Sequence, residues 1–171
     1  MDNKEIIKKL RSEESSAVLD TLKYIIKEGN KDILIEVIGL LHKTNDTIIR
    51  DETLKIIENL KDQESVLVII NAIENPDHKD ILALLVASCW KNGLNFSDHA
   101  LNFVEIFIQS DFLLAFEVFT VIDNFEYLDL QLAKTCILRL ESSIEEITDD
   151  KEALFNELID LLKNINENPA D

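Results

Sequence analysis

The chain has 171 residues, with 34 acidic and 17 basic side chains, a formal charge of −17, 46 % hydrophobic residues, three Gly and two Pro. That length suits one domain or a short repeat array, and the scarcity of Gly and Pro favours an all-α fold. The negative charge disfavours nucleic acid as a ligand, because phosphate backbones are bound by Lys and Arg, and it disfavours anionic membrane surfaces.

Apolar residues at helical spacing predict helices from the first residues onward. The first helix covers Asn3 to Leu10. A second follows Ser12 and stops at Gly29, because Gly accepts the left-handed backbone that ends helices. Asn30 is expected to cap the third helix.

The next three helices are predicted at 45–60, at 64–74 and from Asn75-Pro76-Asp77 to Gly93. In the Asn-Pro-Asp turn, Asn can cap a helix, Pro suits its first position, and Asp complements the positive end of its dipole. Further helices are predicted from Ser97 and, with Ser110 as cap, over 111–126.

The ninth helix is expected to begin at Asp129, and the last at 148–149. Asp149 and Glu152 there fit a capping pattern. Cys89 and Cys136 are far apart in sequence and lie in apolar helical patterns. They are expected to be buried, reduced thiols, with a disulfide as the lesser alternative.

The segment 111–126 is apolar almost all the way round a helix, so other helices must cover it. Its polar residues Glu117, Thr120 and Asn124 are spaced three and four apart, which aligns them in one stripe. We expect most of its Phe residues to lie in the core and this stripe to be where the helix meets a partner.

The predicted helices form pairs that recur every 30 to 40 residues or so, which is typical of an α-solenoid. Second helices begin near Asp46, Asp77, Asp111 and Asp149. The sequence therefore predicts one domain, 1–171, built from pairs at about 2–29, 30–61, 62–93, 94–126 and 127–168.

One repeat carries a family-like motif. Asn45-Asp46, followed by Ile49-Arg50 and Thr53, resembles the start of a HEAT second helix, and Asn75-Pro76-Asp77 resembles the same turn without its Arg. The chain thus resembles the HEAT-repeat and armadillo-like superfamily. This resemblance implies a right-handed superhelix of about ten helices in five antiparallel pairs, a concave surface formed by second helices, and a role in holding other proteins.

No Lys or Arg occurs between Lys91 and Lys134, a window that holds seven of the eight Phe together with seven acidic residues. One interpretation is a patch that receives a basic or amphipathic peptide. The other is that the Phe are core and the acids solvate helix ends. The candidate partner-binding residues are Ser88, Trp90, Lys91, Glu117, Thr120, Asp123 and Asn124.

No catalytic, cofactor or metal residue is predicted. His42, His78 and His99 stand outside any metal-binding spacing, and nucleophile and phosphate-loop motifs do not occur. Trp90 is either an exposed contact or a buried residue packed beside Gly93.

The sequence predicts a non-enzymatic scaffold that binds a protein or peptide carrying Lys or Arg through the concave face. One alternative is a small-ligand or cofactor-handling protein similar to HEAT-like bilin lyases, with a pocket beside Trp90 and the Phe cluster. Another is a structural subunit held by its terminal pairs. Apolar runs are too short to span a membrane and no secretory segment is evident, so a cytoplasmic location is expected. The oligomeric state stays open.

Overall fold

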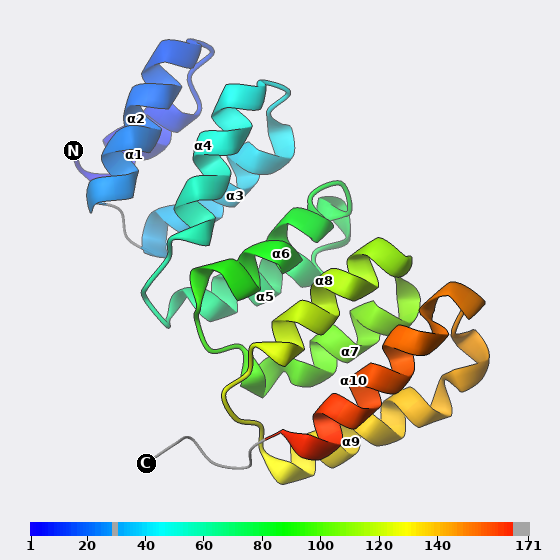
Figure 1. Cartoon of the computed structure of the whole chain (residues 1–171). Helices are drawn as coiled ribbons and strands as arrows, with labels where there is room; N and C mark the ends of the chain where they lie inside the picture. Colours follow the sequence, from blue (N-terminus) through cyan, green and yellow to red (C-terminus); the bar gives the residue numbers. More distant parts are fainter. Residues whose placement is uncertain (29–30, 166–171) are drawn as a thin grey trace. The chain divides into compact units, whose positions relative to one another are not determined.

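The computed structural model describes the backbone of residues 1–28 and 31–165, and side chains of 1–26 and 32–165. All regular structure in these residues is helical, with ten α-helices joined by short connections (Figure 1). This confirms the predicted all-α class. The α-helices are α1 (Asn3–Leu10), α2 (Ser15–Glu28), α3 (Lys31–Lys43), α4 (Thr47–Glu58), α5 (Ser65–Glu74), α6 (Leu82–Asn92), α7 (Ala100–Gln109), α8 (Phe112–Asp123), α9 (Leu130–Ser142) and α10 (Glu152–Asn164).

Contacts divide the chain into two compact units, Met1–Leu94 and Asn95–Asp171, here called the N-terminal unit and the C-terminal unit. In the N-terminal unit, α1 packs on α3 and α3 on α5 in one layer, while α2 packs on α4 and α4 on α6 in a second layer (Figure 1). Each odd-numbered helix also packs on the helix that follows it. The unit is thus a two-layer stack of three helix pairs.

The C-terminal unit repeats this packing. Its first helices, α7 and α9, contact each other, as do its second helices, α8 and α10. Its core includes Phe96, Phe103 and Phe107, each at most 1 % exposed, and the rings of Phe96 and Phe103 meet edge to face with centroids 6.1 Å apart. For these three Phe residues the interpretation as core is correct.

An Asp side chain caps the first turn of several helices by accepting a backbone N–H hydrogen bond. The capped helices are α1 (Asp2), α4 (Asp46), α8 (Asp111) and α9 (Asp129). A carboxylate there satisfies an unpaired N–H group and complements the positive end of the helix dipole. Asp111 takes the position predicted for Ser110, whose hydroxyl instead donates to the carbonyl of Phe107 at 3.3 Å.

Three predicted helix starts are wrong. Ser97–His99 forms a 3-10 turn (η2), and α7 begins only at Ala100. At Asn75-Pro76-Asp77 the Asn side chain accepts the N–H of Asp77 at 3.0 Å, but this closes a 3-10 turn (η1, Pro76–His78), and α6 begins only at Leu82. Likewise Asp149–Lys151 forms a 3-10 turn (η4), and α10 begins at Glu152 without a side-chain cap. Capping residues satisfy the first N–H groups of either kind of helix, so they do not select the α-helix.

Gly93 ends α6 as predicted, with a φ of 71°. This left-handed backbone is strained for residues with a Cβ atom, which explains Gly here. The predicted stop at Gly29 and cap at Asn30 lie outside the described residues.

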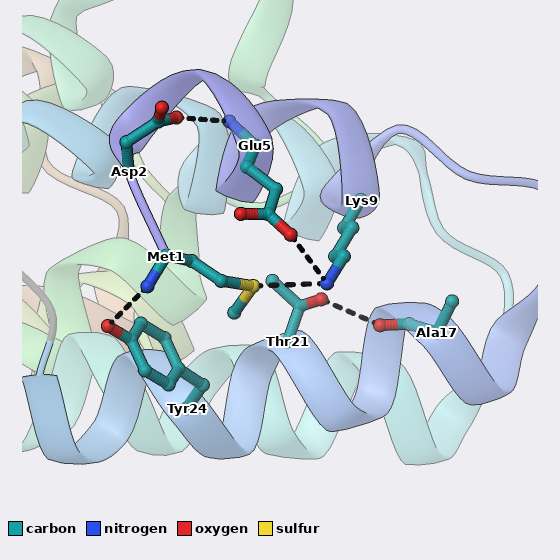
Figure 2. A network of polar contacts seen from close by, with 7 residues as sticks. All are labelled: Met1, Asp2, Glu5, Lys9, Ala17, Thr21 and Tyr24. Atoms are coloured by element: carbon teal, nitrogen blue, oxygen red, sulfur yellow. Dashed lines mark hydrogen bonds and ion pairs between the residues drawn. The ribbon is translucent and has the colours of Figure 1, made fainter.

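Polar contacts tie the first residues to α1 and α2 (Figure 2). Glu5 and Lys9, one turn apart in α1, form an ion pair of 3.0 Å. The backbone amine of Met1 donates to the hydroxyl of Tyr24 in α2 at 3.0 Å. These contacts are exposed, so we assign the packing of α1 mainly to its buried residues Ile6 and Leu10.

Cys89 in α6 and Cys136 in α9 are free and buried, as predicted. Burial disfavours the thiolate, which raises the pKa of Cys136 to about 11 and that of Cys89 further still. Among the described helices, none is both long and apolar enough to cross a membrane.

Candidate functional site

Three large apolar side chains at the start of α8 are exposed. Phe112, Leu113 and Phe116 have 38 %, 76 % and 51 % of their surface accessible. The two rings stack with centroids 6.4 Å apart and planes 28° apart. Adjoining exposed apolar side chains are typical of interaction surfaces, whereas isolated ones are ordinary. We call these three residues the α8 apolar patch.

This patch corrects the expectation that the Phe residues of 111–126 are mostly buried. Phe112 and Phe116 are exposed, and Phe119 and Phe125 are half-buried. The sequence did contain a signal for this exposure. Leu113 lies four residues before Glu117, so it continues the predicted stripe by one turn toward the start of the helix.

The predicted polar stripe continues the patch along α8. Asn124 is exposed, whereas Glu117 and Thr120 are half-buried. The Thr120 hydroxyl donates to the carbonyl of Phe116 at 2.9 Å, and the Asn124 amide donates to the carbonyl of Thr120 at 2.8 Å. Thr120 and Asn124 thus direct these donors into their own helix, whereas the side chains of the apolar patch are exposed.

Asp123 occupies the last position of α8 and is exposed. Carbonyl groups make the carboxyl end of a helix partly negative, so a carboxylate there is unfavourable and a cation is favourable. The sequence of α8 contains no Lys or Arg that could supply that cation. The end of α8 therefore has no compensating cation from its own helix.

The C-terminal unit carries most of the chain's negative charge. It contains 17 acidic and 4 basic residues, a formal charge of −13, whereas the N-terminal unit contains 17 and 13, a formal charge of −4. Two of the four basic residues are engaged internally: Arg139 forms a two-pronged ion pair with Glu105 at 2.6 and 2.9 Å, and Lys151 is buried. Lys134 and Lys163 remain as exposed cations of this unit.

Lys151 is the basic residue that sequence reasoning missed. Its side chain is 2 % exposed, and its ammonium donates to the backbone carbonyls of Phe107, Ile108 and Ser110 at 3.1, 3.0 and 2.7 Å. It lies 5.7 Å from the centre of the Phe107 ring. Burial lowers the pKa of Lys151, against the opposing charges of Asp150 and Asp111. This contact holds the carboxyl end of α7 against the start of α10.

The remaining predicted site residues lie on α6, in the N-terminal unit. Ser88 is fully buried and its hydroxyl donates to the carbonyl of Leu85 at 2.7 Å, so it does not lie on a surface as expected. Trp90 is half-buried, and the Lys91 ammonium lies 5.6 Å from its ring centre. Lys91 also pairs with Glu58 of α4 at 2.7 Å.

Histidines approach each other more closely than their sequence positions suggest. The rings of His42 and His78 lie 5.4 Å apart, and His42 Nδ1 contacts a carboxylate oxygen of Asp80 at 2.8 Å. His78 Nδ1 is bonded to the carbonyl of Ala72 at 2.9 Å. Across residues 1–26 and 32–165, no group of three His, Cys, Asp or Glu side chains is arranged to hold a metal ion.

No family model matches the chain, and comparisons with curated proteins and with solved structures gave no match. Sequence patterns and the geometry of each unit therefore carry the functional conclusion.

Proposed function

We propose that this chain is a non-enzymatic, HEAT-like protein-binding scaffold whose C-terminal unit holds a basic amphipathic helix of a partner against α8. The observation that carries the proposal is the α8 apolar patch, exposed in the more acidic of the two units. An amphipathic helix would cover Leu113 and Phe116 with its apolar face and bring Lys or Arg to Asp123.

The packing within each unit supports a solenoid. Second helices pack on second helices, α2 on α4 and α4 on α6 in one unit and α8 on α10 in the other. In an α-solenoid such a layer forms the concave binding surface. The right-handed superhelix and the single domain of five pairs belong to this proposal, as does a cytoplasmic location, which the two free thiols support.

Apolar burial and charge have separate roles in the proposed complex. Fully covering a Leu or Phe side chain contributes about 1.5 to 3 kcal/mol, so the patch supplies most of the affinity. The exposed carboxylates attract a basic partner over longer distances and mainly raise the association rate, an effect that salt screens. The acidic residues Glu157 and Asp160 of α10, the helix packed on α8, add to this attraction.

The test uses a fluorescein-labelled peptide of about 18 residues in which Leu recurs at helical spacing and Lys fills the other positions. Binding to the full chain is followed by fluorescence anisotropy. The double variant Leu113→Ala/Phe116→Ala should weaken binding about tenfold or more, because it removes the apolar anchors. Leu138→Ala, on α9 and 66 % exposed, is the matched control and should bind like the wild type.

Charge is tested by reversing one carboxylate at a time. Asp123→Lys should slow association and flatten its salt dependence, whereas Asp98→Lys, an exposed site outside α8, should have a smaller effect. Equal binding of a scrambled peptide of the same composition, or equal effects of the two α8 changes and their controls, would overturn the proposal.

A further inference from the structure

A cleft of about 360 Å³ lies in the N-terminal unit where α4 gives way to α5. Its apolar lining includes Leu34, Val37 and Ile56, which are almost wholly buried, and Ile26, which is 48 % exposed. Ligand sites in proteins are typically clefts of a few hundred Å³ with mostly apolar walls and a few polar groups. The dimensions and walls of this cleft suit a small molecule with an apolar part.

Two cations border the same cleft, Lys55 and Lys61. The Lys55 ammonium pairs with Glu52 at 2.5 Å, and the Lys61 ammonium donates to the carbonyl of Asn92 at 3.1 Å. An ammonium has three donors, so each Lys can also donate to a ligand oxygen. The acidic residue at the cleft, Asp62, directs a carboxylate oxygen to the N–H of Glu64 at 3.0 Å.

The first turn of α5 adds further polar groups at the cleft. Its backbone N–H groups make this end of the helix partly positive, and Glu64 at the cap position makes no side-chain cap hydrogen bond. Ser65 lines the cleft and is fully buried, and within the described part of the chain its hydroxyl has no hydrogen-bond partner. A buried hydroxyl without a partner is unfavourable, and a ligand oxygen that reached it from the cleft would satisfy it.

We propose that this cleft binds a small carboxylate with an apolar tail. The carboxylate lies beside Lys55 and Lys61 at the start of α5, and the tail lies along Ile26, Leu34 and Ile56. This site is independent of the α8 apolar patch, since its lining residues all belong to the N-terminal unit.

The test probe is sodium octanoate, titrated into the full chain and followed by amide NMR shifts, with 1-octanol and octylammonium as neutral and cationic probes of the same tail. Octanoate should bind saturably, shift amide signals around the cleft, and bind about tenfold more tightly than octylammonium. Lys55→Gln and Lys61→Gln should each reduce the preference for octanoate over 1-octanol.

Two exposed Ile residues of the N-terminal unit provide a matched pair of variants. Ile26→Glu places a carboxylate at the cleft and should weaken octanoate binding about tenfold, whereas Ile48→Glu, at a 61 % exposed site outside the cleft lining, should leave it unchanged. Leu113→Ala/Phe116→Ala should also leave it unchanged, which separates this site from the proposed function. Octylammonium binding as tight as octanoate, shifts located elsewhere, or no saturation at millimolar octanoate would overturn the proposal.

Discussion

Lys151 shows how one buried cation can secure two helices. A charged side chain loses its hydration on burial, and this penalty is tolerated when its hydrogen-bond donors are satisfied. Here the three donors of the ammonium meet three carbonyls at and just beyond the end of α7, where backbone carbonyls lack partners within the helix. The side chain therefore acts as a C-terminal cap supplied by a segment more than 40 residues away.

Replacing Lys151 by Met should destabilise the C-terminal unit by about 2 to 4 kcal/mol, because it removes three charge-assisted hydrogen bonds to backbone carbonyls. Urea unfolding followed by circular dichroism measures this loss. Lys134→Met, at an exposed position of α9, should change stability by less than about 0.5 kcal/mol. Similar losses of stability in both variants would mean that the buried Lys151 contributes no more to stability than the exposed Lys134 does.

Stability should also depend on pH through Lys151. Its folded-state pKa is lowered below the ordinary 10.5, so between these values the unfolded chain holds a proton that the folded chain has lost. The unfolding free energy then rises with pH across that window, and below it Lys151 adds no pH dependence. The stability difference between wild type and Lys151→Met should widen as pH approaches 10.5, and a narrowing difference would contradict the lowered pKa.

Sequence reasoning could not have found this contact. Lys151 follows Asp149 and Asp150, so its local setting is that of an exposed, charged helix start. Its hydrogen-bond partners are distant in sequence, and they are carbonyl groups, which every residue has. Only the placement of the turn that precedes α10 at the end of α7 brings them together.

At the scale of the helix, α8 shows where hydrophobic periodicity stops being informative. When apolar residues surround a helix, their spacing predicts that it is a helix but not which side faces solvent. Ala115, Val118, Val121 and Ile122 are buried, whereas Phe112 and Phe116 are not, although the Phe residues are the larger. The buried side is set by contacts with α7 and α10, which the sequence of α8 does not contain.

The first turn of α8 offers a direct test of its cap. Asp111→Ala should destabilise the C-terminal unit by about 1 kcal/mol, because the N–H of Leu114 loses its acceptor. Asp111→Asn keeps that acceptor and should recover most of the loss. Ser110→Ala should have a smaller effect than Asp111→Ala in the same urea experiment, and the reverse order would restore Ser110 as the functional cap.

Helix boundaries could be predicted from the sequence where a signal in the adjacent residues was sufficient. The bounds of α1, the helix starts near Asp46 and Asp129 and the Gly93 stop were predicted correctly, since each depends on local backbone chemistry. The start of α6 was not, because the choice between a 3-10 turn and an α-helix after Asn75 depends on how the following residues pack. For the candidate site, the sequence pointed to the right helix and to its acidic surroundings, but not to the exposed apolar residues.

At the scale of the whole chain, charge and apolar exposure are unevenly distributed. The C-terminal unit has a formal charge of −13 against −4 for the N-terminal unit and also carries the α8 apolar patch. The cleft with its two Lys residues lies in the less acidic N-terminal unit. The proposed basic partner and the proposed small carboxylate are thus matched to different units.

Each unit contains one cysteine, Cys89 in the first and Cys136 in the second. Both thiols are buried and held protonated by their raised pKa, so a thiol reagent should react with them only after local or global opening. With Cys89→Ser and Cys136→Ser, labelling rates at neutral pH measure the opening of each unit separately. Equal labelling rates would indicate that the chain opens as one cooperative domain, as the sequence predicts. Unequal labelling rates would indicate two domains that open separately.

The two cysteines therefore report the opening of each unit without any engineered labelling site. A partner bound to α8 should slow labelling at Cys136 by the factor one plus its concentration over its Kd, while octanoate should slow labelling at Cys89. If both units open together, either ligand should slow labelling at both cysteines. The labelling rates of both cysteines, measured with one ligand bound, would then show whether that ligand also stabilises the other unit.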